Sequence, residues 1–161
     1  MTTTTRTPPD DQTWRSTLAK AAARRTLADA DFLTTVAAMT ERIPQTQIAA
    51  ALHTSQANVS RWAARGREHA QRRRAGRLGA DPYEIAQRYA LGEISRDAML
   101  DALTSWTYEE PPQVPAGPLG AWEDGVVPLP EGSFERTVQR AFDDGLLDGE
   151  EYETILRAIA D

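Results

Sequence analysis

The segment from residue 45 to residue 66 constrains the fold of this chain more than any other part. It reads QTQIAAALHTSQANVSRWAARG, and its small or apolar residues recur at a spacing that lets two short helices share one core at a steep angle. Those core residues are Ile48, Ala49, Leu52, Val59 and Trp62. The pattern predicts one helix from Gln45 to about Leu52, and a second that begins at Gln56 and continues at least to Arg65.

The second of these helices carries polar residues on the side that faces away from the expected core. Ser55 is a natural N-cap for it, because a serine hydroxyl accepts a hydrogen bond from the free backbone N–H groups of a first helical turn. Asparagine and glutamine can pair with adenine through two hydrogen bonds, and arginine can pair with guanine. The outward residues are Gln56, Asn58, Ser60 and Arg61. This layout is typical of a helix-turn-helix that places its second helix in the major groove of DNA.

On these residues the chain resembles the Cro/CI-type (XRE-like) helix-turn-helix repressors of bacteria and phages. The matching residues are Gln47-Ile48-Ala49, Leu52, Ser55-Gln56, Val59-Ser60-Arg61-Trp62 and Gly66. The match is tight over residues 45–66 and loose over residues 29–68. The resemblance implies that Gln45 and Gln56 contact phosphates or bases, and that Asn58, Ser60 and Arg61 read bases.

Two positions of the turn depart from that family. His53 stands where the family usually has glycine, so the turn requires a left-handed backbone at a residue that adopts it with some strain. Thr54 replaces the usual apolar residue that follows, which we expect to weaken the core slightly.

A basic run follows the motif. Between Arg61 and Arg77 the chain has seven arginines and one acid, Glu68. Beside a helix that enters a groove such arginines are expected to contact phosphate, although a solvated basic surface is the alternative. The expected phosphate contacts are Arg65, Arg67, Arg72, Arg73 and Arg74. The run is either a helical extension or a loose tail, since Gly66, Gly76 and Gly79 disfavour one rigid rod.

The two halves of the chain carry opposite charge. Residues 1–80 hold 13 basic and 6 acidic side chains, a net charge of +7, whereas residues 81–161 hold 5 basic and 18 acidic side chains, a net charge of -13. Because DNA repels carboxylates, we expect the acidic half to face away from it. The acidic half either meets a protein partner or keeps the protein soluble.

The remainder of the N-terminal half is expected to complete a bundle of four to five helices over residues 12–78, after a disordered tail at residues 1–11. High helix propensity predicts helices over residues 12–27 and 29–42. Their expected inward residues are Trp14, Leu18, Ala21 and Ala22 in the first, and Phe32, Leu33, Val36 and Met39 in the second.

The C-terminal half is expected to form helical hairpins at residues 81–106 and 133–161, joined by a proline-rich linker at residues 107–132. Capping signals predict helix starts at Asp81-Pro82, after Ser95 and at Asp148, with Glu84 and Glu151 at capping-box spacing. Ile85–Leu103 aligns weakly with Val138–Leu156. A hairpin this short cannot bury its own apolar face, so each one needs a partner. The sequence FDDGLLDGEEYETIL weakly resembles the short C-terminal oligomerisation hairpins (SHOCT-like) of bacteria.

Several classes of chemistry are not expected. The chain has no cysteine and two histidines, His53 and His69, neither with a carboxylate at ligand spacing, so we expect no metal site. The phosphate-binding loops and nucleophile motifs of enzymes are absent, and we expect no cofactor and no enzymatic activity. The sequence holds neither a bilayer-spanning run nor a secretory signal, so we expect a cytoplasmic protein without a membrane partner.

Together these patterns predict an all-α protein with an N-terminal helix-turn-helix bundle and C-terminal helical hairpins. The expected function is sequence-specific binding of double-stranded DNA in transcription regulation, as a repressor. Because one recognition helix reads few base pairs, we expect a homodimer, with the C-terminal hairpins as the candidate interface. Two alternatives remain: an antitoxin whose acidic half covers a basic toxin, and an adaptor that binds only protein.

Overall fold

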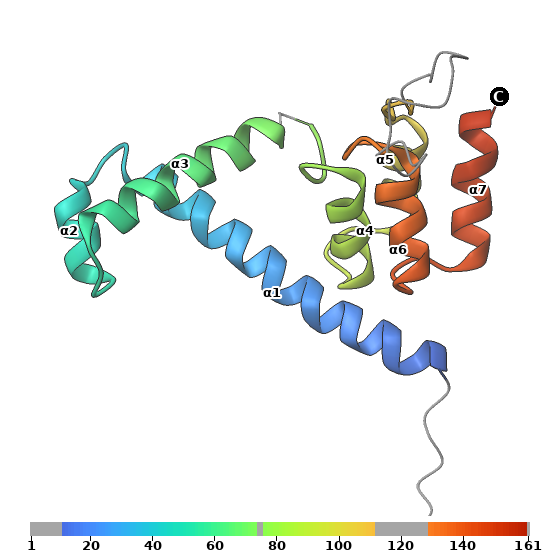
Figure 1. Ribbon diagram of the computed structural model, residues 1–161, viewed down its shortest axis with the longest axis horizontal. Helices are drawn as coiled ribbons and strands as arrows, with labels where there is room; N and C mark the ends of the chain where they lie inside the picture. The colour runs from blue at the N-terminus through green and yellow to red at the C-terminus, as the bar shows by residue number, and fades with distance from the viewer. Residues whose placement is uncertain (1–10, 74–75, 112–128, 161) are drawn as a thin grey trace, which may run out of the picture.

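The computed structural model describes residues 11–73, 76–111 and 129–160. All regular secondary structure in these ranges is helical, which confirms the predicted all-α class. A long helix, α1, runs diagonally through the molecule (Figure 1). One half of it packs against α3 (Gln56–Arg72) and shares a core with α2 (Gln45–Ala51). The other half contacts α4 (Pro82–Ala90) of a second group of helices that extends to α7 (Gly149–Ala160).

Helix α1 spans Asp11–Met39 without interruption, so the prediction of two helices over residues 12–27 and 29–42 was wrong. The sequence between them, Leu-Ala-Asp, contains neither glycine nor proline, and nothing local stops the helix. Most of the expected tail lies outside the described residues, but Asp11 already belongs to α1.

The buried side of α1 also differs from the predicted one. Trp14 and Leu18 are 41% and 60% exposed, whereas Ala23 and Leu27 are buried. The buried side of α1, with Ala23 and Leu27, is rotated round the helix axis relative to the predicted one. The reason is that α3 and α4 pack against α1 on the side of Ala23 and Leu27. In the second half Val36 is buried as expected, although Phe32 and Met39 remain partly exposed.

The helix-turn-helix segment forms as predicted, with α2 at Gln45–Ala51 and α3 at Gln56–Arg72. The two helices share a small core with α1, against which Trp62 packs. The core residues are Val36, Ile48, Ala49, Val59 and Ala63. The prediction that Leu52 is a core residue was wrong. It is 41% exposed, because it follows the last residue of α2 and lines an open apolar groove between α1 and α2.

The basic run is helical as far as Arg72. Gly66 does not break the rod, contrary to the prediction, and is buried inside α3 against α1. The helix ends before Gly76, whose φ of 90° is in the left-handed region. The helical alternative for this run is therefore the right one up to Arg72.

The C-terminal hairpins have the predicted layout. The first consists of α4 at Pro82–Ala90 and α5 at Arg96–Thr104. The second begins with a π-helical turn, η1, at Glu135–Gln139, which continues into α6 at Arg140–Asp143 and is followed by α7 at Gly149–Ala160. Each turn has a glycine in the left-handed region, Gly92 with φ 77° and Gly145 with φ 73°.

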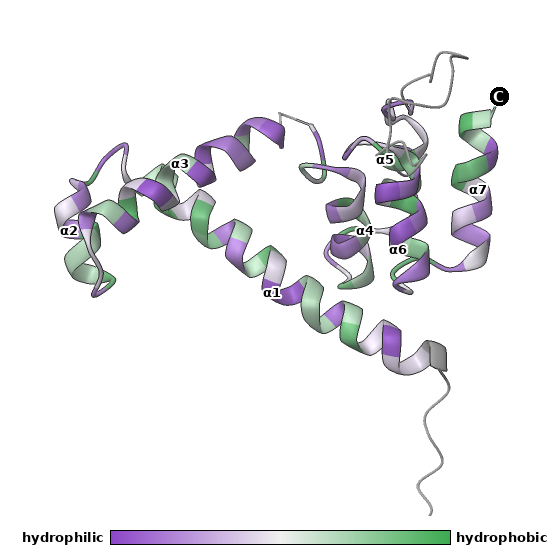
Figure 2. Cartoon of the chain, viewed as in Figure 1, coloured by the Kyte–Doolittle hydropathy of each residue, from purple (hydrophilic) through white to green (hydrophobic). Residues whose placement is uncertain are grey.

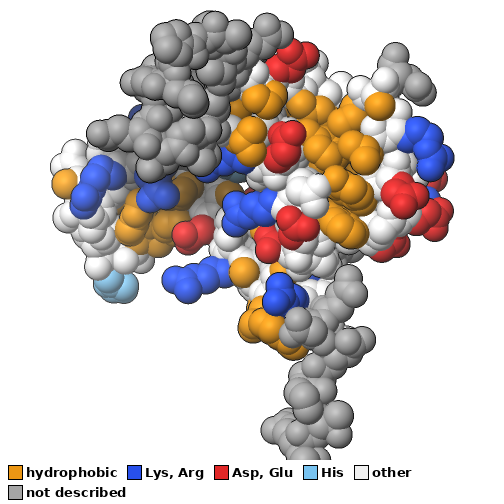
Figure 3. Space-filling model, turned by 45° about the vertical axis from the view of Figure 1, so that its right-hand side comes forward, with side chains coloured by type: hydrophobic (Ala, Val, Ile, Leu, Met, Phe, Trp, Pro, Cys, Tyr) orange, Lys and Arg blue, Asp and Glu red, His pale blue; other side chains and the backbone are white. Residues whose placement is uncertain are grey.

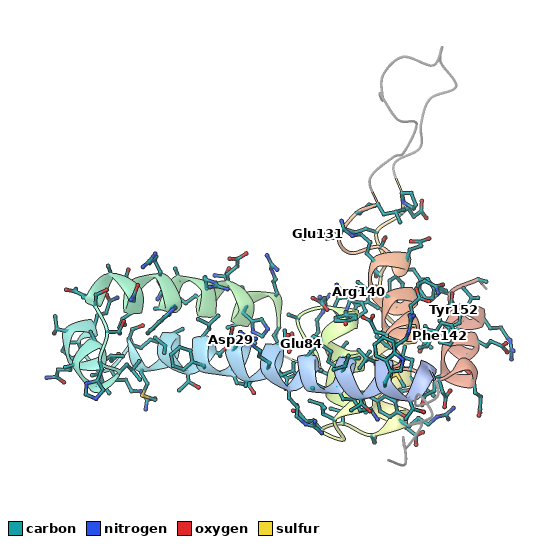
Figure 4. All side chains as sticks on the ribbon, turned by 60° about the horizontal axis from the view of Figure 1, so that its bottom comes forward. Asp29, Glu84, Glu131, Arg140, Phe142 and Tyr152 are labelled. Atoms are coloured by element: carbon teal, nitrogen blue, oxygen red, sulfur yellow. The ribbon has the colours of Figure 1, made fainter. Side chains whose placement is uncertain are left out.

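The two hairpins are each other's packing partner. Their buried residues form one core, and the aligned positions Ile85 and Val138 both lie in it. The core also includes Met99, Leu103, Ala141, Leu146, Leu147 and Ile155. Phe142 of α6 stacks on Tyr152 of α7 with ring centroids 4.7 Å apart (Figure 4). The apolar faces that neither hairpin could bury alone are thus buried together.

The predicted linker lies largely outside the described residues. Its described ends meet, because the Glu109 N–H donates a hydrogen bond to the Gly132 carbonyl oxygen over 3.1 Å. Trp106 and Tyr108 pack against the core of the hairpins. Figure 2 shows that hydrophilic residues dominate much of α3, whereas the end of α7 is hydrophobic.

Candidate nucleic-acid interface

The turn between α2 and α3 has the geometry that the sequence predicts. His53 has a φ of 51°. This is the left-handed region that we expect at a turn position where the family usually has glycine. Ser55 is the N-cap of α3, and its Oγ accepts a hydrogen bond from the Asn58 N–H over 3.2 Å. The first turn of α3 is therefore capped as the sequence predicts.

The exposed side of α3 is flat at its centre and polar at its edges. Residues three, four and seven apart share a helix face, so Ala57 and Ala64 lie along the middle of the exposed side. Small side chains there let the helix backbone approach a partner surface closely. The flanking exposed residues are Gln56, Ser60 and Arg67 on one edge and Arg61, Arg65 and Arg72 on the other.

Asn58 and Arg61 are linked rather than independent. The half-buried Asn58 donates a hydrogen bond from Nδ2 to the Thr54 Oγ1 over 2.8 Å, and its Oδ1 accepts one from the Arg61 guanidinium. Thr54, expected only to weaken the core, instead orients Asn58. Because its amide is already engaged, Asn58 positions Arg61 at this surface, and the exposed Arg61 is the group that reaches outward.

The other residues expected to contact DNA are spread over α2 and α3. Gln45, the first residue of α2, is half-buried, and Ser55 and Arg73 are exposed. Arg74 lies outside the described residues. Arg65 and Arg72 line a groove between α3 and α1 together with Arg25, a basic residue not predicted from the sequence, and with the carboxylates of Asp29 and Glu68. Only the packing of α1 along α3 brings Arg25 there, so no local signal could have identified it.

Acidic groups limit how much of α3 suits a polyanion. Glu68 lies on the exposed side and forms an ion pair with Arg72, with 2.6 Å between Oε1 and the guanidinium nitrogen. The part of the exposed side without a carboxylate therefore runs from Gln56 to Arg67, about three helical turns.

His69 near the end of α3 joins the two groups of helices. Its Nε2 lies 3.0 Å from Glu84 Oε2 at the start of α4. In the part of the chain that the structure describes, no three His, Cys, Asp or Glu side chains gather as a metal site would require.

Glu84 is the centre of a buried ionic network. Its carboxylate accepts hydrogen bonds from the Ala80 N–H over 2.9 Å and from the Arg88 guanidinium over 2.8 and 2.9 Å. Burial raises the pKa of Glu84, but these hydrogen bonds and the neighbouring positive charges outweigh it and lower the pKa below its ordinary value. Arg88 also pairs with Glu93 over 2.7 Å and with Asp31 of α1 over 3.4 Å.

The capping role predicted for Glu84 accounts for only part of its contacts. The Asp81 Oδ1 does accept the Glu84 N–H over 2.8 Å, but the Glu84 carboxylate turns to Ala80 and Arg88 instead of the Asp81 N–H. The spacing of Glu84 and Arg88, four residues apart on α4, was the available signal for this pair.

Comparison of the chain with protein-family models, curated proteins and solved structures found no match. Among the helices of the described ranges, none has the length and apolar composition to cross a bilayer.

Proposed function

We propose that the protein binds double-stranded DNA in a sequence-specific manner, with α3 as the recognition helix. The observation that carries the proposal is the exposed side of α3, where Ala57 and Ala64 leave the centre flat and polar or basic residues line both edges. A helix of this shape fits the major groove, and its first turns reach deepest.

The residues divide into two roles. Arg61, held by Asn58, is the candidate for pairing with guanine, and Gln56 and Ser60 are placed for other base edges. The groups suited to phosphate are Gln45 and Ser55 near the helix starts and Arg65, Arg67, Arg72, Arg73 and Arg74.

The distribution of charge supports this orientation. Acidic side chains gather over the C-terminal hairpins in Figure 3, and these hairpins lie at the opposite end of the molecule from α2 (Figure 1). DNA bound at α3 would therefore approach the half of the chain with a net charge of +7 and stay away from the half with -13.

The test is selection of duplexes from a random pool, followed by titration of the selected duplex and a scrambled one. Six neutralised phosphates would give a slope of log K against log salt of about -5. We expect tighter binding of the selected duplex at each salt concentration. No salt-dependent binding of either duplex would refute the proposal and favour the protein-only adaptor.

A homodimer belongs to this proposal, since repression needs two half-sites about 34 Å apart. Among the described residues, the partly exposed apolar side chains include those of the groove between α1 and α2, with Ile43 and Leu52, and those at the end of α7, with Leu156 and Ile159. The groove belongs to the same unit as α3, whereas α7 lies at the far end (Figure 1). A two-fold axis at the groove therefore suits adjacent half-sites better than one at the C-terminal hairpins.

The antitoxin alternative is favoured by one observation on α7. Leu156 and Ile159 are partly exposed on a helix that also exposes Glu150 and Glu153, a surface suited to a basic protein. Co-expression with a basic protein encoded next to it would give a stoichiometric complex in that case. Leu156→Glu should then abolish the complex and leave DNA binding intact.

A further inference from the structure

A set of hydrogen bonds joins the turn of the helix-turn-helix to the recognition helix. Asn58 donates from Nδ2 to the Thr54 Oγ1 over 2.8 Å, and its Oδ1 accepts from the Arg61 guanidinium. The orientation of this amide follows from its partners, because a guanidinium only donates and therefore requires the oxygen of Asn58. Thr54, Asn58 and Arg61 are thus linked in one network, called the Thr54 network below.

The backbone at both ends of the first hydrogen bond is also held. The Asn58 N–H donates to the Ser55 Oγ over 3.2 Å, and the Thr54 N–H donates to the Ala49 carbonyl oxygen of α2 over 2.9 Å. The hydroxyl that accepts from Asn58 is therefore anchored to the first helix of the motif. A side chain held in this way has less conformational freedom to lose when it meets a ligand.

The Thr54 network restricts what Asn58 can recognise. Pairing of an asparagine with adenine needs both ends of the amide, the oxygen to accept from N6 and the nitrogen to donate to N7. The Asn58 oxygen already accepts from Arg61, and the nitrogen already donates to Thr54. Asn58 in this arrangement supports Arg61 instead of presenting the pattern that adenine requires.

Arg61 keeps enough donors to bind a base while Asn58 holds it. A guanidinium has five N–H bonds, and Asn58 accepts from Nη2. The major-groove edge of guanine presents two acceptors, O6 and N7, which the remaining N–H bonds can reach. A hydrogen bond to a residue three positions earlier also draws the guanidinium toward the first turn of α3, the part of a recognition helix that enters the groove deepest.

We propose that Thr54 is a positioning residue that sets the preference of the first turn of α3 for guanine over adenine. Its hydroxyl holds Asn58, the amide of Asn58 is thereby committed to Arg61, and Arg61 meets the base in a fixed orientation. The inference rests on the proposed function and adds to it which base is read. It also assigns the choice of that base to a residue of the turn, which needs no contact with DNA itself.

The network is tested first on the full chain without DNA, by nuclear magnetic resonance. Thr54→Val retains the shape of the side chain and removes its hydroxyl, so we expect the fold to be kept. The side-chain NH2 signals of Asn58 and the Nε–H signal of Arg61 should shift. Thr154→Val is the matched control, since the Thr154 hydroxyl donates within α7 to the Glu150 carbonyl oxygen over 2.7 Å, and it should leave these signals in place. Unchanged signals in Thr54→Val would overturn the proposal.

The choice of base is then measured with duplexes. Arg61→Ala identifies the base pair at which the preference is lost, and the selected duplex is compared with one that carries A·T in place of G·C there. Thr54→Val should lower the preference for guanine about fivefold, the effect of roughly one hydrogen bond. The salt slope should stay unchanged, because no phosphate contact is removed. Thr54→Ser retains a hydroxyl and should restore the preference of the parent.

Other outcomes of the duplex measurement distinguish this proposal from the proposed function. A parent-like preference in Thr54→Val, an equal loss in Thr54→Ser, or a base other than guanine at the position read by Arg61 would overturn the role of Thr54. In each of these cases the parent still prefers its selected duplex, so the proposed function stands. A parent without any preferred duplex would refute the proposed function, and the role of Thr54 with it.

Discussion

Gly66 of α3 lies directly against the backbone of Leu33 of α1. A Cβ atom at position 66 would be 2.0 Å from the Leu33 carbonyl oxygen and 2.9 Å from the Ala37 Cβ. The contact with the Leu33 oxygen is far shorter than any van der Waals contact, and that oxygen belongs to a helix backbone that cannot rotate away. The absence of a side chain at Gly66 is therefore what lets α1 and α3 pack at this distance.

Gly66→Ala should destabilise the protein by about 2 kcal/mol or more, because overpacking outweighs the gain in helix propensity of about 1 kcal/mol. Urea unfolding followed by circular dichroism measures the change. Gly149→Ala is the matched control, since nothing lies within 4 Å of a Cβ atom there. It should be neutral or slightly stabilising; equal losses in both variants would refute the packing role.

Glu84→Gln should destabilise the protein by about 3 kcal/mol, because Arg88 would stay buried with a weakened partner. The pH dependence gives a second readout. Because the folded pKa of Glu84 is lowered, its contribution is present above the unfolded pKa and is lost as the pH falls through the folded value. The free energy of unfolding should therefore decline less on acidification below about pH 4.5 in Glu84→Gln than in the parent.

All four tyrosines should resist ionisation in the folded protein. Burial, followed by the hydrogen bond to Asp144, raises the pKa of Tyr83 to about 12. The hydrogen bond to Glu151, followed by burial, raises the pKa of Tyr89 to about 12, and burial raises the pKa of Tyr108 and Tyr152. This stability is present below the unfolded pKa and is lost as the pH rises toward the folded values. Tyrosinate absorbance should thus stay low at pH 10 and rise together with alkaline unfolding; full ionisation at pH 10 in folded protein would contradict this.

Arg61→Ala and Arg73→Ala should have different effects on DNA binding. Loss of a base contact by Arg61→Ala should cost about 1 to 3 kcal/mol and relax the preference at one base position. Arg73→Ala should weaken binding to selected and scrambled duplexes alike and reduce the salt slope by about 1. Titrations of both duplexes at several salt concentrations distinguish these results, and identical, sequence-independent losses would refute the assigned roles.

Trp62→Ala should destabilise the helix-turn-helix unit by about 2 kcal/mol, below the range for fully buried aromatic residues, because Trp62 is half-buried. It packs edge-on against Phe32, with ring centroids 5.3 Å apart. Leu18→Ala, at an exposed position of α1, should change stability by less than about 0.5 kcal/mol. Chemical denaturation of the full chain measures both; a near-neutral Trp62→Ala would remove this residue from the core.

Local chemistry explains why several helix starts and turns after α1 could be predicted. Ser55 and Asp81 cap helices through atoms three residues away, and Gly92 and Gly145 satisfy turns that need a left-handed backbone. Such interactions involve neighbours in the chain and are therefore visible in the sequence. The position of Arg61 on the exposed side of α3 follows from the same periodicity.

The amino-acid sequence alone determined the helical class, the helix-turn-helix elements, most caps and the division of charge between the two halves. Only the tertiary structure decided that α1 is continuous, which of its sides is buried, that Gly66 is a contact rather than a break, and that His69 meets Glu84. The physical reason is the range of the interactions. Caps, turns and helix periodicity depend on residues within about four positions of one another, whereas burial and ion pairing depend on which distant elements come together.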